Sequence, residues 1–306
     1  MSPAGPLPRG SHRSAQHEGT LMSLAPLLAF ADRHPRLLVL TGAGCSTAAG
    51  IPDYRDSDGA WKRNQPMRYQ VFVADELARK RYWARSMAGW RTMAGARPGP
   101  AHLALASLQA SGRIALLVTQ NVDGLHSAAG SVEVVDLHGR IDTVCCLACG
   151  ARTPRAVLQE VLTRGNPQWV GLAALSAPDG DADLQAQDFA AFEVPACGSC
   201  AGMLKPDVVF FGENVPRQRV AVVRSALAAA DALLVAGSSL MVYSGYRFVE
   251  EAVAAGKPVV VVNRGRTRAD AVVTLKIEYE VGEALQALAA AALRHTLPIA
   301  HGERAA

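Results

Sequence analysis

Short apolar runs recur along the chain, and each one ends at small or polar residues. Near-continuous Val and Leu runs of this length are typical of strands buried on both faces, as in a parallel sheet. Ala- and Leu-rich segments of helical length separate them. The pattern predicts strands at residues 36–40, 114–118, 132–135, 208–211, 233–236 and 259–262, and helices at 101–110, 217–230, 246–255 and 282–293.

Alternating strands and helices predict an α/β fold with a Rossmann-like parallel sheet. Ligands of such sheets bind beyond the carboxyl ends of the strands. The residues expected there are small or polar: Gly42, Gly44, Gln120, Asn121, Gly237, Ser238, Ser239 and Asn263. We assign residues 21–60, 101–140 and 205–296 to this domain. The segments 61–100 and 141–204 break the alternation and read as insertions that form a smaller helical, zinc-binding domain.

Composition narrows the class of protein. Half of the residues are hydrophobic, 19% are charged, and the net charge is +4, with Lys and Arg spread along the chain. A dense basic patch, which a nucleic-acid reader would carry, is therefore not expected. No segment approaches the roughly 20 apolar residues of a membrane span. Residues 1–20 read as a disordered leader, either plain or a weak mitochondrial targeting signal, and 297–306 as a tail.

Four of the six cysteines form two C-x-x-C pairs, Cys146 with Cys149 and Cys197 with Cys200. Each pair can place two thiolates on one tetrahedral zinc ion. Four thiolates leave no open coordination position, so the predicted site is structural. Cys145 would have C-x-x-x-C spacing and is the poorer ligand. The alternative is a set of redox dithiols or unrelated cysteines.

The glycine turn at residues 41–46 follows a predicted strand and allows phosphate to approach backbone N–H groups. It lacks the third glycine of the ordinary dinucleotide fingerprint, so alone it is a weak signal. The loop that follows strengthens it, because Asp53, Tyr54 and Arg55 place a carboxylate, an aromatic ring and a guanidinium in succession.

Taken together, these motifs resemble the sirtuin family over about residues 37–288. The segments that carry the resemblance are 42–46 with 50–55, 119–126, 137–139, the two C-x-x-C pairs, 205–213, 237–240 and 262–263. Within the family the chain is most similar to the class II, sirtuin 4-like branch, through Tyr54 and residues 81–85, 166–169, 177–181 and 242–248. The Tyr-x-x-Arg pair of the desuccinylase branch is missing from the first motif, so a preference for succinyl-lysine is not implied. Asp136 replaces a usual Glu.

The resemblance implies an NAD-consuming protein-lysine deacylase that releases nicotinamide and acylated ADP-ribose. His138 would be the base, because a neutral imidazole can accept a ribose proton. Asn121 and Asp123 would hold the nicotinamide end. The other implied cofactor-binding residues are Gly42, Ala43, Gly44, Asp53, Tyr54, Arg55, Gln120, Val122, Gly237, Ser238, Ser239, Asn263, Arg264, Gly265 and Val281, the last beside the adenine. The implied peptide-binding residues are Val209, Phe210, Phe211 and Gly212.

The expected partners are acylated-lysine proteins, without nucleic acid or membrane, and the expected enzyme is a monomer of the bacterial cytoplasm, or of the mitochondrion if the leader is a transit peptide. His126 is expected to be structural or to lie on the ribose side, and Cys45 to pack beside the cofactor. Three other functions stay open: transfer of ADP-ribose to protein or hydrolysis of NAD on the same fold, NAD sensing without turnover, and a nucleic-acid-associated zinc protein.

Overall fold

The computed structural model describes residues 23–54, 56, 58, 60, 62, 66–171, 175–176, 182–183 and 188–296. Its larger sheet has six parallel strands in the order β11-β10-β9-β1-β2-β3. Every residue of β1, β9 and β10 is buried, as the continuous apolar runs predict. The six strands are β1 (Leu37–Thr41), β2 (Ile114–Thr119), β3 (Val135–Asp136), β9 (Ala232–Ala236), β10 (Val259–Val262) and β11 (Leu275–Ile277).

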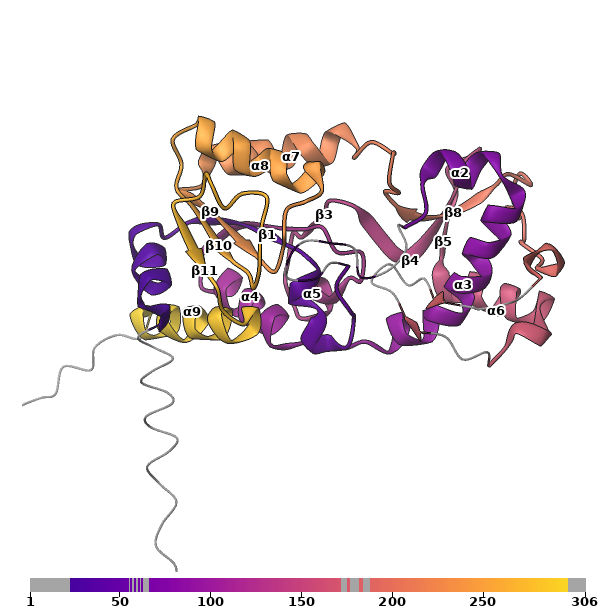
Figure 1. Ribbon diagram of the computed structural model, residues 1–306, viewed down its shortest axis with the longest axis horizontal. Coiled ribbons are helices and arrows are strands. Elements are labelled where there is room, and N and C mark those ends of the chain that lie inside the picture. The colour runs from indigo at the N-terminus through magenta and orange to yellow at the C-terminus, as the bar shows by residue number, and fades with distance from the viewer. Residues whose placement is uncertain are drawn as a thin grey trace, which may run out of the picture.

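Helices cover both faces of this sheet (Figure 1). One face packs against α7 (Arg217–Ala229) and α8 (Tyr243–Ala254), with Phe248 fully buried. The other face packs against α4 (Pro100–Ala110), α9 (Val281–Thr296) and a helix at residues 23–33. All four predicted helices are present, and the expected doubly covered parallel sheet is confirmed.

A second, three-stranded antiparallel sheet lies to the right of the first in Figure 1, in the order β5-β4-β8. Its strands are β4 (Gly139–Cys146), β5 (Arg152–Pro154) and β8 (Leu204–Val208), and the helices beside it are α2 (Tyr69–Ala74), α3 (Glu76–Gly95) and α6 (Arg155–Gly165). An aromatic core fills this region, with Phe72, Trp83 and Phe192 fully buried. The remaining elements are α5 (Leu125–Ala128), the two-residue strands β6 (Leu175–Ser176) and β7 (Ala182–Asp183), and the 3-10 helices η1 (Ala43–Cys45), η2 (Thr47–Ala49), η3 (Pro167–Trp169) and η4 (Phe189–Ala191).

Two predicted strands need correction. The run 208–211 is not a strand of the parallel sheet: β8 ends at Val208 and pairs antiparallel with β4, and Phe211 forms only an isolated bridge with Arg68. Pro206 hid this strand from the sequence pattern, yet a proline is tolerated because β8 is an edge strand. The run 132–135 contributes only Val135 to β3, since Val132 is 65% exposed and Glu133 adopts φ of 52°.

Candidate active site

A cleft of about 490 Å³ opens at the carboxyl ends of the parallel strands. Gly42 follows β1, Gln120 and Asn121 follow β2, Ser238 follows β9, and Asn263 follows β10. The strand-end residues expected in the binding site therefore share one cleft. Those that line it are Gly42, Ala43, Gly44, Gln120, Asn121, Val122, Gly237, Ser238, Ser239, Asn263 and Arg264.

The glycine turn lies in contact with the turn after β9. A Cβ atom on Gly42 would lie 2.7 Å from the Cβ of Ser238, and one on Gly44 would lie 2.8 Å from the Cα of Gly237. The two backbones can approach this closely only because side chains are missing. The packing leaves backbone at the cleft floor, as a phosphate-binding turn requires.

Asn121 is anchored from below the cleft. Its side-chain amide donates to the carbonyl of Gly42 and to Oγ of Ser46, both at 3.0 Å. Ser46 in turn donates to Asp123 over 2.7 Å, and Asp123 also accepts from the backbone of Leu125. Asp123 does not line the cleft, but through Ser46 it holds Asn121, which does. Sequence reasoning gave Ser46 no role; its place in the glycine motif is the signal that could have shown one.

A buried histidine pair lies behind this network. His126 is 1% exposed, its Nε2 is 2.9 Å from Oγ1 of Thr41, and its ring centroid is 4.7 Å from that of His102. Burial, and then the neighbouring His102, lower the pKa of His126 to about 3. His126 therefore stays neutral within the core. Cys45 is 1% exposed, and burial raises the pKa of its thiol to about 12, as suits a packing residue.

His138 lines the cleft with a defined tautomer. Its Nδ1 lies 2.9 Å from the carbonyl oxygen of Gln120. A carbonyl only accepts, so Nδ1 carries the proton and Nε2 keeps its lone pair. Nε2 lies 2.7 Å from Oγ of Ser244. Burial lowers the pKa of His138 to about 4 against the opposing Gln120 bond, and the cations Arg219 and Arg247 lower it further. The imidazole is therefore neutral at physiological pH.

The segment from Val209 to Gly212 forms one wall of the cleft. The Val209 N–H donates to the carbonyl of His138 over 2.7 Å, the Phe211 carbonyl accepts from Tyr69, and that of Gly212 accepts from Gln70. These bonds join the end of β8 to the backbone of His138, so the smaller sheet helps to place the histidine.

Some of the other predicted cofactor residues line the cleft, and others do not. Asp53 and Tyr54 line the cleft, and Asp53 is paired with Lys62. Gly265 is not among the lining residues, and Val281 is buried in the core at the start of α9. Arg55 lies outside the described residues.

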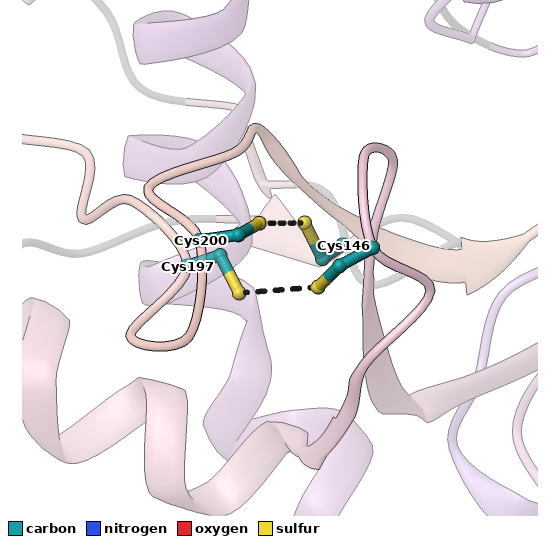
Figure 2. Close-up of side chains that lie close together, drawn as sticks. Cys146, Cys197 and Cys200 are labelled. Carbon is teal, nitrogen blue, oxygen red and sulfur yellow. Dashed lines mark hydrogen bonds between the residues drawn. The ribbon is translucent and has the colours of Figure 1, made fainter.

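The four predicted zinc ligands come together. All their Sγ atoms lie within 4.8 Å of one another, with 3.5 Å between Cys146 and Cys200 and 3.8 Å between Cys149 and Cys197. Figure 2 shows the two loops that carry these cysteines facing each other. Tetrahedral Zn–S bonds of ~2.3 Å separate sulfur atoms by roughly 3.8 Å, so the cluster fits a structural zinc ion.

The backbone beside Cys146 favours a thiolate at that residue. A hydrogen bond from the Cys149 N–H lowers the pKa of Cys146 to about 6, against the effect of burial, and the N–H of Ala148 lowers it as well. A Cβ on Gly202 would lie 2.8 Å from the sulfur of Cys146, so only glycine fits beside it. Cys145 is half-buried and is not part of the cluster, which is consistent with the choice of Cys146 as the ligand.

Among the described residues, no helix is both long enough and apolar enough to cross a membrane.

Comparison with known proteins decides the family. The Sir2 family model matches residues 42–244, a stretch that holds the glycine turn, His138 and all four clustered cysteines. The chain belongs to the Sir2 family. It is 58% identical over 269 residues to NAD-dependent protein deacetylase 2 of Bradyrhizobium diazoefficiens, which covers 86% of this chain and 98% of the relative. It is 56% identical over 268 residues to the NAD-dependent protein deacetylase of Bordetella bronchiseptica, covering 88% and 98%.

Solved Sir2 structures share the fold of this Sir2-family chain. A complex of Sir2 with a p53 peptide and NAD+ superposes with a TM-score of 0.68 at 29% identity, covering 86% of this chain and 95% of that one. A complex of Sir2 with the inhibitor EX-527, 2'-O-acetyl-ADP-ribose and deacetylated p53 peptide gives 0.68 at 27% identity, covering 86% and 96%.

Proposed function

We propose that this Sir2-family chain is an NAD-dependent protein-lysine deacylase that acts on acyl-lysine side chains of proteins. It is similar along most of its length to bacterial proteins named NAD-dependent protein deacetylases. The observation that carries the proposal is the neutral His138, whose unprotonated nitrogen lies in the cleft at the strand ends. An unprotonated imidazole nitrogen in a ligand cleft is what a general base requires.

NAD, the co-substrate, supplies the ribose carbon from which nicotinamide leaves and the ribose hydroxyl that receives the acyl group. The backbone at Gly42 and Gly44 holds its phosphates, with Ser238 on the facing turn. Asn121 orients the nicotinamide end and is itself held by Ser46, which Asp123 braces. Nε2 of His138 then accepts the proton of the ribose hydroxyl. One water is consumed, and nicotinamide, O-acyl-ADP-ribose and the free lysine are the products.

The peptide lies along Val209 to Gly212. We propose that it adds beside this segment as an extended strand, in the manner of β-augmentation. Support comes from the position of the segment on the cleft wall and from the backbone bond that ties it to His138. An acyl-lysine held there would extend toward the imidazole.

Finer assignments also belong to the proposal. We place the chain in the class II, sirtuin 4-like branch, and extend its substrates beyond acetyl-lysine to longer acyl groups. The residues quoted for that branch include Tyr54 and Val242–Ser244, all of which line the cleft. We further propose a monomer of the bacterial cytoplasm. The dispersed charge and the bacterial relatives support this.

Mass spectrometry of NAD reactions with acetyl- and longer acyl-lysine peptides tests the activity. The wild type should form acylated ADP-ribose, and His138→Ala should lower the rate by about 100- to 10,000-fold, the usual contribution of a general base. His34→Ala, at the opposite end of the sheet, is the matched control. Nicotinamide release with ADP-ribose on protein or free in solution would instead indicate a transferase or a glycohydrolase. NAD binding without nicotinamide release would indicate a sensing module.

A further inference from the structure

Ser244 makes the shortest contact of the His138 ring. It is the second residue of α8, and its Oγ lies 2.7 Å from Nε2. Because the Nδ1–H donates a hydrogen bond to the Gln120 carbonyl, Nε2 of the neutral ring can only accept. Ser244 must therefore donate to Nε2. The ring is thus held at both nitrogens, by the end of β2 and by the start of α8. The proposed reaction assigns no role to this serine.

The approach of α8 to His138 is built into the packing. A Cβ atom on Gly245 would lie 2.4 Å from Oε1 of Gln120, so only glycine lets the helix start reach this residue. The Gln120 side chain is fixed in turn, since its amide donates to Oγ of Ser238 over 2.8 Å and to the carbonyl of Thr41 over 3.1 Å. The residue that holds Nδ1 therefore also determines where Ser244 stands.

The charges around His138 oppose its protonation. Arg219 from α7 and Arg247 from α8 both act on the ring as cations. Asp136, at the end of β3, is paired with Arg140. The other charged side chains that line the cleft are Asp53, Asp56, Lys62, Glu213, Arg264 and Arg266, and of these Asp53 pairs with Lys62 and Glu213 with Lys205. A protonated ring needs an acceptor for Nε2–H, and Ser244 is the group in contact with that atom.

We propose that Ser244 is a positioning residue that serves His138 in both of its protonation states. In the resting cleft its hydroxyl donates to Nε2 and holds the ring. In the reaction the ribose O–H bond breaks, its proton forms the Nε2–H bond, and the ribose oxygen bonds to the acyl carbon while the π electrons between that carbon and the lysine nitrogen move onto the nitrogen. The Ser244 hydroxyl then rotates, keeps its own proton, and accepts from Nε2–H until the ring passes that proton to the lysine nitrogen as the amine leaves. A hydroxyl can do both, because it is one donor and two acceptors. The inference rests on the proposed role of His138.

The test compares Ser244→Ala, Ser244→Thr and Ser244→Cys with the wild type, and Ser225→Ala at an exposed site on α7 is the matched control. Nicotinamide exchange reports the step before His138 acts, and formation of acylated ADP-ribose reports the step after it. Ser244→Ala should keep exchange within about twofold and lower the second rate by about 10- to 100-fold, as for the loss of a hydrogen bond to a charged group. Threonine should restore the rate, and cysteine, a weak acceptor, should fall between.

Nitrogen-15 NMR of the imidazole rings in the free protein at pH 7.5 gives an independent reading. The wild type should show His138 protonated at Nδ1 with Nε2 hydrogen-bonded. Ser244→Ala should move only the Nε2 resonance, toward that of a free lone pair. Equal loss of both rates, or wild-type rates with an unmoved resonance, would overturn the inference. If the wild type forms no acylated product, the proposed function fails and the catalytic role of Ser244 fails with it, whereas the NMR spectra still decide whether the contact exists.

Discussion

The two sheets of this molecule are stabilised in different ways. The parallel sheet lies between two layers of helices, and its central strands are buried along their whole length. The antiparallel sheet alternates between buried and half-buried positions along β4, and β5 is largely exposed. Apolar burial on both faces stabilises the first sheet. The second sheet adds two anchors, a four-cysteine cluster and an aromatic core.

The aromatic core of the smaller region contains a buried arginine. Arg155 is fully buried, and its guanidinium lies 4.9 Å from the ring centre of Trp90 and 5.6 Å from that of Trp83. Burial lowers its pKa to about 10. A buried cation of this kind is destabilising unless ring faces compensate for the lost water. We therefore expect that loss of the four-cysteine site would unfold the smaller region and leave the larger one folded.

The largest expected effect is that of removing a zinc ligand, which should unfold the smaller region and leave the larger one intact. Cys146→Ser removes one of the four thiolates and should abolish zinc binding. Because a structural zinc contributes about 10 to 16 kcal/mol to the folding of zinc-finger peptides, the smaller region should then unfold. Cys146 ends the strand that begins beside His138, so unfolding of this strand should displace the imidazole. Deacetylation should then fall by at least about 100-fold, the usual cost of removing one group that stabilises a transition state. Helices α4, α7, α8 and α9 should stay folded.

Zinc analysis, the rate of acetyl-peptide turnover and hydrogen exchange by region measure this result. Cys145→Ser is the matched control, since its sulfur is one residue away and outside the cluster. Loss of zinc in the control but not in Cys146→Ser would contradict the assigned ligand set. Rapid exchange across both regions would show that the two do not fold separately.

A substitution in the larger region should have the opposite pattern. Gly42→Ala would place a Cβ 2.7 Å from that of Ser238 and push apart the two turns at the cleft floor. We expect the dissociation constant for NAD to rise by roughly 10- to 100-fold, equivalent to a binding free energy weaker by about 1.4 to 2.8 kcal/mol, with zinc content unchanged. Calorimetric titration with NAD measures the constant. Gly95→Ala has open space around it and should bind NAD as the wild type does; equal affinities of Gly42→Ala and the wild type would refute the close packing.

The same contrast explains how far the sequence leads. In the parallel sheet, the apolar runs of β1, β9 and β10 give the strands, and the glycine and amide residues after them give the cleft. The cysteine spacing gives the metal ligands. The antiparallel strand β8 is invisible to the same pattern, because Leu204–Val208 contains Lys205, Pro206 and Asp207. Strand β11 is short and has Lys276 at its centre, and the sequence pattern missed it.

Side-chain roles that depend on contacts also stay beyond the sequence. Nothing in the local pattern shows that Asp123 bonds to Ser46 and is not among the cleft-lining residues, or that Val281 lies in the core. The same holds for Ser244, which reaches His138 across 106 positions of chain. Motifs identify which residues gather at a site, but the direction of each side chain follows from the packing of elements that are distant in sequence.

The smallest expected effect is a pH dependence of stability that belongs to the larger region. His126 has a pKa of about 3 in the folded chain and ~6.5 when unfolded. The unfolded chain therefore binds the extra proton as the pH falls below about 6.5, so the folded state loses stability on acidification and keeps it in full above that value. Between pH 7.5 and 5.5 this histidine alone should remove about 1.4 kcal/mol from the free energy of unfolding.

Urea unfolding at pH 7.5 and 5.5, followed in the wild type and in His126→Gln, measures this loss. The variant cannot titrate, so its free energy of unfolding should change by about 1.4 kcal/mol less over the same interval. Zinc content at both pH values is the control, because release of metal would also weaken the smaller region. His138, with a pKa of about 4, also lowers the free energy of unfolding as the pH falls, and its contribution is the same in the wild type and the variant. Identical pH dependence in the two proteins would mean that His126 takes up its proton as readily in the folded chain as in the unfolded one, contrary to the effect of its burial.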